Sequence, residues 1–181
     1  MKILKWTGIV ILALVVLAFA GYKYMQWNTK QSSPEETVEY KQGDLELEVF
    51  YNRPYKKDRE IFGSLVPYDQ VWRTGANEAT TFKTNKDLTI DGKTLPAGKY
   101  TLWTIPGEKS WTVIFNTMQY SWGVNFDGVA SREAEYDALE VKVPVQRSNE
   151  VVEQFTISFK DNNNLSLELA WDQSRVEVPF E

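Results

Sequence analysis

The chain of 181 residues contains no histidine and no cysteine. It therefore cannot form a zinc site built on His or Cys, a Ser-His-Asp or Cys-His catalytic site, an iron–sulfur cluster or a disulfide. A lipid anchor attached through cysteine is excluded for the same reason. Asp, Glu, Lys, Arg and Tyr remain for catalysis or binding, and their spacing predicts neither a metal site nor a cofactor.

The net charge of -5 combines two regions of opposite character. Residues 1–30 contain four lysines and no acid, so 16 basic and 25 acidic residues remain in the rest of the chain, which carries -9. An acidic domain repels the phosphate backbone of nucleic acids. We therefore predict no nucleic-acid partner.

One long apolar segment lies near the N-terminus. Residues 6–22 carry no charge, and a bilayer core of ~30 Å needs roughly 20 mostly apolar helical residues, with a lower limit near 17. We interpret residues 6–24 as a transmembrane signal anchor that follows a cytoplasmic stub, residues 1–5. The outer end of the segment is followed by aromatic residues of the kind that favour the membrane interface: Tyr22, Tyr24 and Trp27.

A cleaved signal peptide is the alternative interpretation. Ala18-Phe19-Ala20 resembles a small-residue cleavage site, and Gly21 would then be the first mature residue. In both cases Lys2 and Lys5 favour a cytoplasmic N-terminus. We predict a single-pass protein of the cytoplasmic membrane whose C-terminal domain is extracytoplasmic (periplasmic).

The exported part divides into a linker and one domain. Residues 25–37 are mostly polar and include a proline, which is typical of a linker. Residues 38–181 suffice for one domain. Apolar and polar residues alternate with period two in five stretches, as in strands with one buried face: 45–51, 139–145, 154–160, 165–171 and 176–180. Turn signals such as Asp91-Gly92 separate them. We predict an all-β fold, an antiparallel, jelly-roll-like β-sandwich.

The middle of the chain departs from this alternation. Residues 99–105 and 111–115 are apolar at both phases, which is typical of strands that are buried on both faces. The non-alternating stretch 61–78 is the predicted cover for the second face.

The stretch 61–82 reads IFGSLVPYDQVWRTGANEATTF. Its VPYxxVWRTGANEAT segment, together with LPAGKYTLWTIPG at 95–107 and WTVIFN at 111–116, closely resembles a bacterial envelope family catalogued as domain of unknown function 2911. The resemblance covers residues 38–180. It implies no activity, and catalytic residues stay unassigned.

The residues of this stretch suggest a binding pocket. Tyr68 and Trp72 would form a stacking wall, and a polar ligand would be fixed by Arg73, Asn77 and Glu78. Trp103 and Trp122 are further candidates, because exposed aromatic rings stack on sugars, whereas Trp111 and Trp171 lie in phase with the core. Alternatively, an ion pair between Arg73 and Glu78 pins the loop while Trp72 fills the core.

Three functions follow from these residues. The first is a binding module for a small polar ligand, a glycan or an envelope partner, in which Trp72→Ala and Arg73→Ala would abolish binding with little loss of stability. The second is a carboxylate-dependent hydrolase or lyase that uses Glu78 and a second acid. The third is a structural or assembly role in the envelope. The pattern favours binding over catalysis.

Overall fold

The computed structural model describes residues 2–181, and side chains from residue 6 onward. The chain forms two compact units, of which the first ends at Ser32 and the second spans Ser33–Glu181.

The first unit is a single helix, α1 (Lys2–Ser32). An 18-residue window within Trp6–Ser32 has a mean hydropathy of 2.0, and this part of the helix is long and apolar enough to cross a membrane or to act as a signal sequence. The helix continues through polar residues that tolerate helical geometry, and Pro34 prevents its extension. Strand β1 (Glu35–Gln42) begins directly afterwards. Residues 25–32 therefore belong to α1 and residues 35–37 to β1, with only Ser33 and Pro34 between them.

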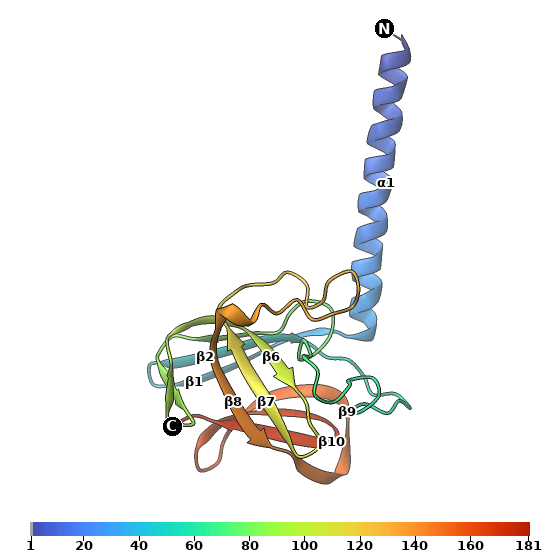
Figure 1. Ribbon diagram of the computed structural model, residues 1–181. Coiled ribbons are helices and arrows are strands. Elements are labelled where there is room, and N and C mark those ends of the chain that lie inside the picture. The colour runs from blue at the N-terminus through green and yellow to red at the C-terminus, as the bar shows by residue number, and fades with distance from the viewer. Residues whose placement is uncertain (1) are drawn as a thin grey trace. The chain divides into compact units, whose positions relative to one another are not determined.

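The second unit is built on a six-stranded antiparallel sheet (Figure 1). Its order is β1-β2-β3-β6-β7-β8, so neighbours in space follow one another in sequence apart from the inserted β4–β5 hairpin. The strands after β1 are β2 (Leu45–Asn52), β3 (Thr81–Thr84), β6 (Gly98–Ile105), β7 (Ser110–Asn116) and β8 (Asp137–Pro144). The short hairpin comprises β4 (Leu88–Ile90) and β5 (Lys93–Leu95), and the predicted Asp91-Gly92 turn joins them with positive φ at both residues.

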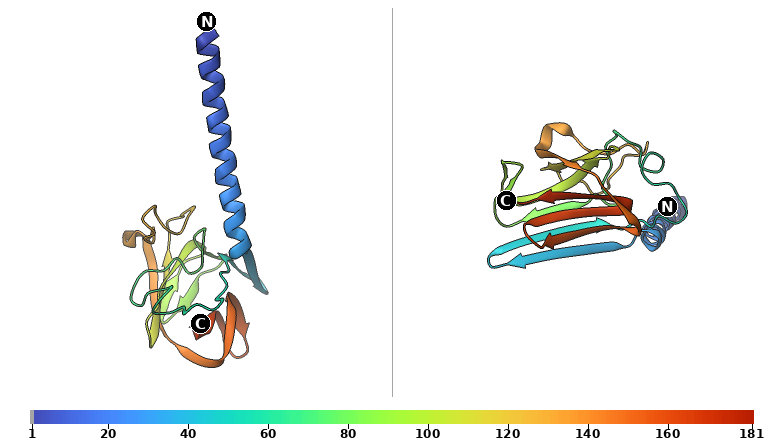
Figure 2. Two further views of the ribbon diagram at one scale, coloured as in Figure 1. Left: turned by 90° about the vertical axis from the view of Figure 1, so that its right-hand side faces the viewer. Right: turned by 90° about the horizontal axis from the view of Figure 1, so that it is seen from below.

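A long two-stranded sheet forms the opposite layer (Figure 2). It pairs β9 (Gln146–Asp161) with β10 (Leu165–Pro179). The pairing register shifts around Asp172, whose φ is 52°. This bulge explains why the core positions change from odd numbers before Asp172 (Leu167, Leu169, Trp171) to even numbers after it (Val176, Val178, Phe180). The two stretches predicted at 165–171 and 176–180 are thus one strand.

The core lies between the two sheets and contains apolar side chains from both inner faces. Figure 1 shows β9 and β10 beside the larger sheet, where they cover the core on the side opposite to that sheet. The prediction of an all-β antiparallel sandwich behind an N-terminal apolar helix is confirmed.

The outer face of β6 and β7 is buried as well, but its cover differs from the expected one. Trp103 and Ile114 point away from the core and are both 0% exposed. The ring of Tyr120 contacts Trp103 edge-on at 5.3 Å, so the cover comes from the loop 117–133 after β7. The expected cover instead joins the core through Ile61, Phe62 and Val66. Between this loop and β8 lies a single turn of 3-10 helix, Ala134–Tyr136.

Candidate functional site

The segment of greatest interest, 72–80, runs beside β6 as an irregular extension of the sheet. The Trp72 amide donates to the Thr104 carbonyl at 2.7 Å, and the Thr104 amide donates back at 3.1 Å. This antiparallel bridge places Arg73 next to Trp103, because residues step in opposite directions along the two strands. Successive side chains then point to opposite faces.

Trp72 and Tyr68 lie on the core side. The Trp72 ring stacks on Trp171 at 5.9 Å and 14°, and it meets Phe155 at 5.0 Å. Tyr68 is half-buried and packs against the same core. These two rings therefore do not share a face with Arg73.

Arg73 and Trp103 lie on the outer face, beneath the loop 117–133. Gly123 lies so close to Arg73 that an added Cβ would sit 2.6 Å from its Cδ. Trp122, the neighbour of Gly123, is half-buried. Among residues 6–181 no hydrogen bond or ion pair reaches the Arg73 side chain, so the alternative Arg73–Glu78 ion pair is not formed. Burial lowers the pKa of Arg73.

The backbone after Arg73 is strained. Thr74 is β-branched, yet its φ is 56°, and Asn77 has a φ of 53°. Hydrogen bonds to the neighbouring structure hold this conformation: the Thr74 and Thr104 hydroxyls lie 3.1 Å apart, and the Thr80 hydroxyl donates to the Thr74 carbonyl at 2.7 Å. Strain of this kind costs of order 1–3 kcal/mol per residue and clusters at ligand clamps and active sites.

Asn77 and Glu78 are oriented by a buried asparagine. The Asn77 side-chain amide donates to Asn52 Oδ1 at 3.3 Å and to the Ser33 carbonyl at 3.4 Å. Asn52, which is 0% exposed, donates in turn to Glu78 Oε2 at 3.1 Å. Asn77 is 7% exposed and acts as a support, whereas the half-buried Glu78 reaches a groove.

This groove lies on the outer face of the sheet and has a volume of about 460 Å³. Strands β2, β3 and β6 contribute Phe50, Thr81 and Lys99, and two loops contribute the rest. Its complete lining is Phe50, Glu78, Ala79, Thr81, Lys99, Gln119, Tyr120 and Ser121. The groove thus combines two aromatic rings with an acid, a cation, an amide and two hydroxyls.

The loop that forms one wall is fixed to the sheet. The Thr101 hydroxyl donates to the Met118 carbonyl at 2.7 Å, and the Gln119 amide donates to the Lys99 carbonyl at 3.1 Å. Tyr120 accepts a hydrogen bond from the Glu133 amide at 3.0 Å. The wall is therefore set before any ligand arrives.

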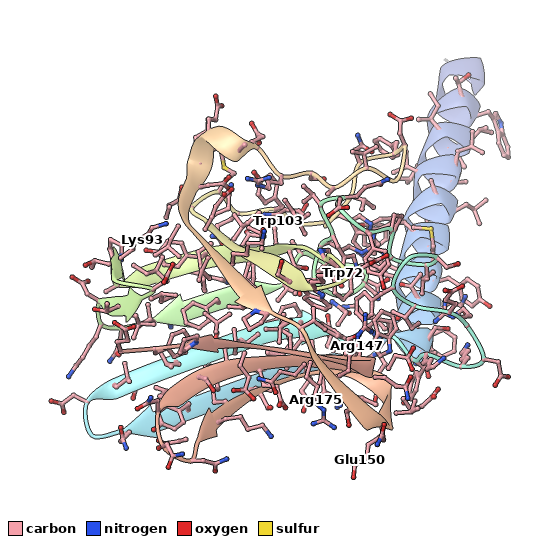
Figure 3. The ribbon with its side chains drawn as sticks, turned by 60° about the horizontal axis from the view of Figure 1, so that its bottom comes forward. Trp72, Lys93, Trp103, Arg147, Glu150 and Arg175 are labelled. Atoms are coloured by element: carbon pink, nitrogen blue, oxygen red, sulfur yellow. The ribbon has the colours of Figure 1, made fainter. Side chains whose placement is uncertain are left out.

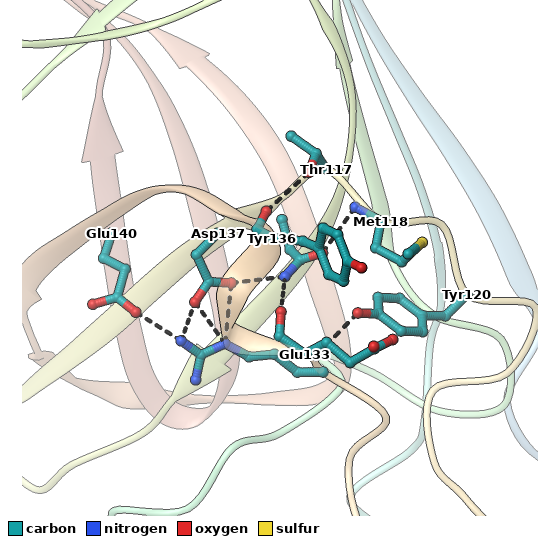
Figure 4. A network of polar contacts seen from close by, with 9 residues as sticks. Thr117, Met118, Tyr120, Glu133, Tyr136, Asp137 and Glu140 are labelled. Carbon is teal, nitrogen blue, oxygen red and sulfur yellow. Dashed lines mark hydrogen bonds and ion pairs between the residues drawn. The ribbon is translucent and has the colours of Figure 1, made fainter.

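A polar network holds the far end of the same loop (Figure 4). Arg132 forms an ion pair with Asp137 and a second with Glu140, the latter at 2.7 Å. Asn116 donates to Asp137 Oδ1 and to the Glu133 carbonyl, both at 2.8 Å.

Tyr120 keeps its proton at neutral pH. Burial raises the pKa of its phenol, and the nearby acids, including Glu133 and Asp137, raise it further, against a lowering by the Glu133 amide. Because the oxygen already accepts from Glu133, the hydroxyl hydrogen is the group that it can offer to a ligand.

The groove residues that sequence reasoning missed come from four separate parts of the chain: position 50, positions 79 and 81, position 99 and positions 119–121. Phe50 carried a signal: it occupies a polar-phase position of the 45–51 strand, where its neighbours in phase are Glu46 and Glu48. An aromatic residue at such a position lies on the outer face. Lys99, Gln119 and Tyr120 carried no comparable signal, since the loop that brings them together is far from Glu78 in sequence.

The groove gives little support to paired-acid catalysis. Among the described residues that line it, Glu78 is the only acid. The described part of the chain also contains no group of three acids that could hold a metal ion.

Figure 3 labels Trp72 and Trp103, the two tryptophans that the bridge directs to opposite faces.

Comparison with known proteins identifies one family, described as a protein of unknown function, DUF2911, whose model matches residues 33–180. No curated protein and no solved structure matches the chain. The match begins directly after α1 and spans all ten strands. The chain therefore belongs to the DUF2911 family of proteins of unknown function.

Proposed function

We propose that the domain 33–181 is a non-catalytic binding module whose groove takes a small polar ligand, a sugar unit of a glycan. The observation that carries this proposal is the groove itself. It places two aromatic rings and several hydrogen-bonding groups around about 460 Å³ of space on the outer face of the sheet.

The chemistry of the lining suits a saccharide. Phe50 is half-buried on the outer face and offers its ring to the apolar face of a sugar. Glu78 and Gln119 can accept from sugar hydroxyls, and Lys99 and Tyr120 can donate to sugar oxygens. Asn52 fixes the Glu78 carboxylate at 3.1 Å, which lowers the entropy lost when a ligand binds.

The strained backbone at Thr74 and Asn77 supports a functional role for the loop that carries Glu78. A loop that only closed the sheet would gain nothing from a β-branched residue at a φ of 56°.

We infer further that α1 is an uncleaved anchor and that the domain lies outside the cytoplasmic membrane, where envelope glycans are found. The apolar helix and the lysines that precede it support this placement. An envelope protein that carries such a glycan is the corresponding partner.

The experiment is a thermal-shift screen of the full chain in detergent micelles against envelope glycans. A sugar at about 100 times its dissociation constant stabilises the folded state by about 2.7 kcal/mol, which raises the midpoint by about 5 to 10 °C. Phe50→Thr keeps a strand-forming residue and Glu78→Gln keeps the shape of the side chain. Each should weaken binding about tenfold or more.

Tyr136→Ala and Glu135→Gln are matched controls, because both residues lie outside the groove and are exposed. They should bind as the unmodified chain does. The proposal is wrong if no glycan raises the midpoint, or if the two groove variants bind with unchanged affinity while folded.

A further inference from the structure

Two buried N–H donors on the outer face of β6 have no partner among the described residues. They are Arg73 Nε and Trp103 Nε1. Trp103 is 0% exposed, so water outside the molecule does not reach its indole. An unsatisfied buried donor costs about 1–3 kcal/mol, and more when the group is charged. One acceptor placed between these two donors would satisfy both of them.

The bridge between Trp72 and Thr104 brings these donors together. It places Arg73 beside Trp103 across the strand pair, with both side chains on the face away from the core. Tyr120 holds the Trp103 ring edge-on at 5.3 Å. Both donors therefore lie on the face that the loop 117–133 covers.

The loop is shaped to receive the Arg73 side chain. A Cβ at position 123 would lie 2.7 Å from Arg73 Cβ and 2.6 Å from its Cδ, so only glycine allows the loop to lie this close. The Gly123 amide donates to the Asn77 carbonyl at 3.1 Å, and the Gly123 carbonyl accepts from Ser131 at 3.2 Å. The stem of Arg73 is thus fixed while part of the side chain stays exposed.

The charge of Arg73 also lacks a counterpart. No acid between residues 6 and 181 pairs with it, although the domain is rich in acids. The other partly buried arginines have acidic, hydroxyl or carbonyl partners. Arg53 pairs with Glu36 at 2.6 Å, Arg132 pairs with Glu140 at 2.7 Å, and Arg147 donates to the Ser174 hydroxyl at 2.7 Å. Arg73 differs from these three.

We propose that Arg73 and Trp103 form an anion-binding site for a carboxylate, phosphate or sulfate group, separate from the sugar groove. The guanidinium presents N–H groups in a planar fork that matches two oxygens of such a group. The indole N–H donates a further hydrogen bond. The strained Thr74 and the close-fitting Gly123 fix the arginine in place, which reduces the entropy lost on binding.

The test titrates the full chain in micelles with inorganic phosphate, sulfate and acetate, at constant ionic strength with chloride as the reference anion. Indole N–H resonances are followed by NMR, and the Trp103 signal is assigned with Trp103→Phe. We expect saturable binding that shifts the Trp103 resonance. The most effective of the three anions identifies the class of ligand.

Three variants and one control separate the roles of charge and geometry. Arg73→Met removes charge and donors and should abolish binding. Arg73→Lys keeps the charge but loses the fork, and Trp103→Phe loses only the indole donor, so each should weaken binding about ten- to a hundredfold. Arg59→Gln removes a positive charge from an exposed loop and should leave binding unchanged.

The proposal fails if the folded chain binds none of the three anions saturably, or if Arg73→Lys and Trp103→Phe bind as tightly as the unmodified chain. It also fails if an anion binds without moving the Trp103 resonance. Should Arg73→Met not fold, the two milder variants and the resonance still decide the outcome. Sugar binding in the groove is measured separately, so either proposal can fail alone.

Discussion

The substitution Trp72→Ala distinguishes a core role for this tryptophan from the binding role that its sequence context suggested. Its ring contacts Trp171 and Phe155, and it also meets Phe62 and Trp111, each at 6.2 Å. Truncating a core Trp to Ala costs about 3–5 kcal/mol. Because Trp72 is only half-buried, we expect a loss near the lower value, about 3 kcal/mol, which is a large part of the 5–15 kcal/mol typical of a domain.

Trp122→Ala is the matched control. Trp122 is also half-buried, but it makes no aromatic-ring contact with any residue that the structure describes, so its loss should cost less than about 1 kcal/mol. Urea unfolding of the full chain in micelles, followed by tryptophan fluorescence, measures both. With a slope of about 2 kcal/mol per molar urea, Trp72→Ala lowers the midpoint by about 1.5 M. Equal losses for the two variants would refute the reasoning, as would a Trp72→Ala chain of unchanged stability.

Three further predictions concern backbone fit, pH and topology. Gly75 has a φ of 144°, and a Cβ there would lie 2.7 Å from the Asn52 carbonyl oxygen, so Gly75→Ala should lower the free energy of unfolding in urea by about 2–5 kcal/mol. The control Gly43→Ala, at a φ of 57° in open space, should lower it by only about 1–2 kcal/mol. Similar losses for the two variants would disprove the clash at Gly75. Burial raises the pKa of Tyr51. The stability that this residue contributes is complete below pH 10 and falls by about 1.4 kcal/mol per pH unit above pH 10, where the unfolded state ionises. Tyr51→Phe should make this fall shallower in alkaline unfolding curves, and an unchanged slope would contradict the role of Tyr51. Alkaline phosphatase fused after Ser32 should be active outside the cytoplasm, and activity confined to the cytoplasm would overturn the proposed topology.

The fold could be predicted because its signals are local. Strict alternation marked β2 and β8 of the larger sheet and both strands of the smaller one, and Asp91-Gly92 marked the β4–β5 turn. The end of α1 could not be predicted, since polar residues such as Gln26 and Lys30 suit a solvated helix as well as a linker. Only Pro34 marked the boundary.

The candidate site could be predicted only in part because it depends on pairing between distant segments. Glu78 does line the groove, but Trp72 and Arg73 face opposite sides, which follows only once the segment pairs with Thr104 of β6. Tyr120 joins the site through a loop fixed by Thr101. The position of Phe50 on the outer face could be predicted from the sequence, because it is an aromatic residue at a polar position of an alternating strand.

Trp72 also links the two layers of the molecule, because its backbone pairs with Thr104 of β6 and its ring stacks on Trp171 of β10. Opening this segment would expose the Trp72 ring and release Arg73 in one event, so the amide protons of Trp72 and Thr104 should exchange with solvent deuterium only as fast as that shared opening occurs. An anion held by Arg73 would slow both exchange rates by the same factor. Two backbone amides that hold a tryptophan in the core would thereby report on occupancy at the surface.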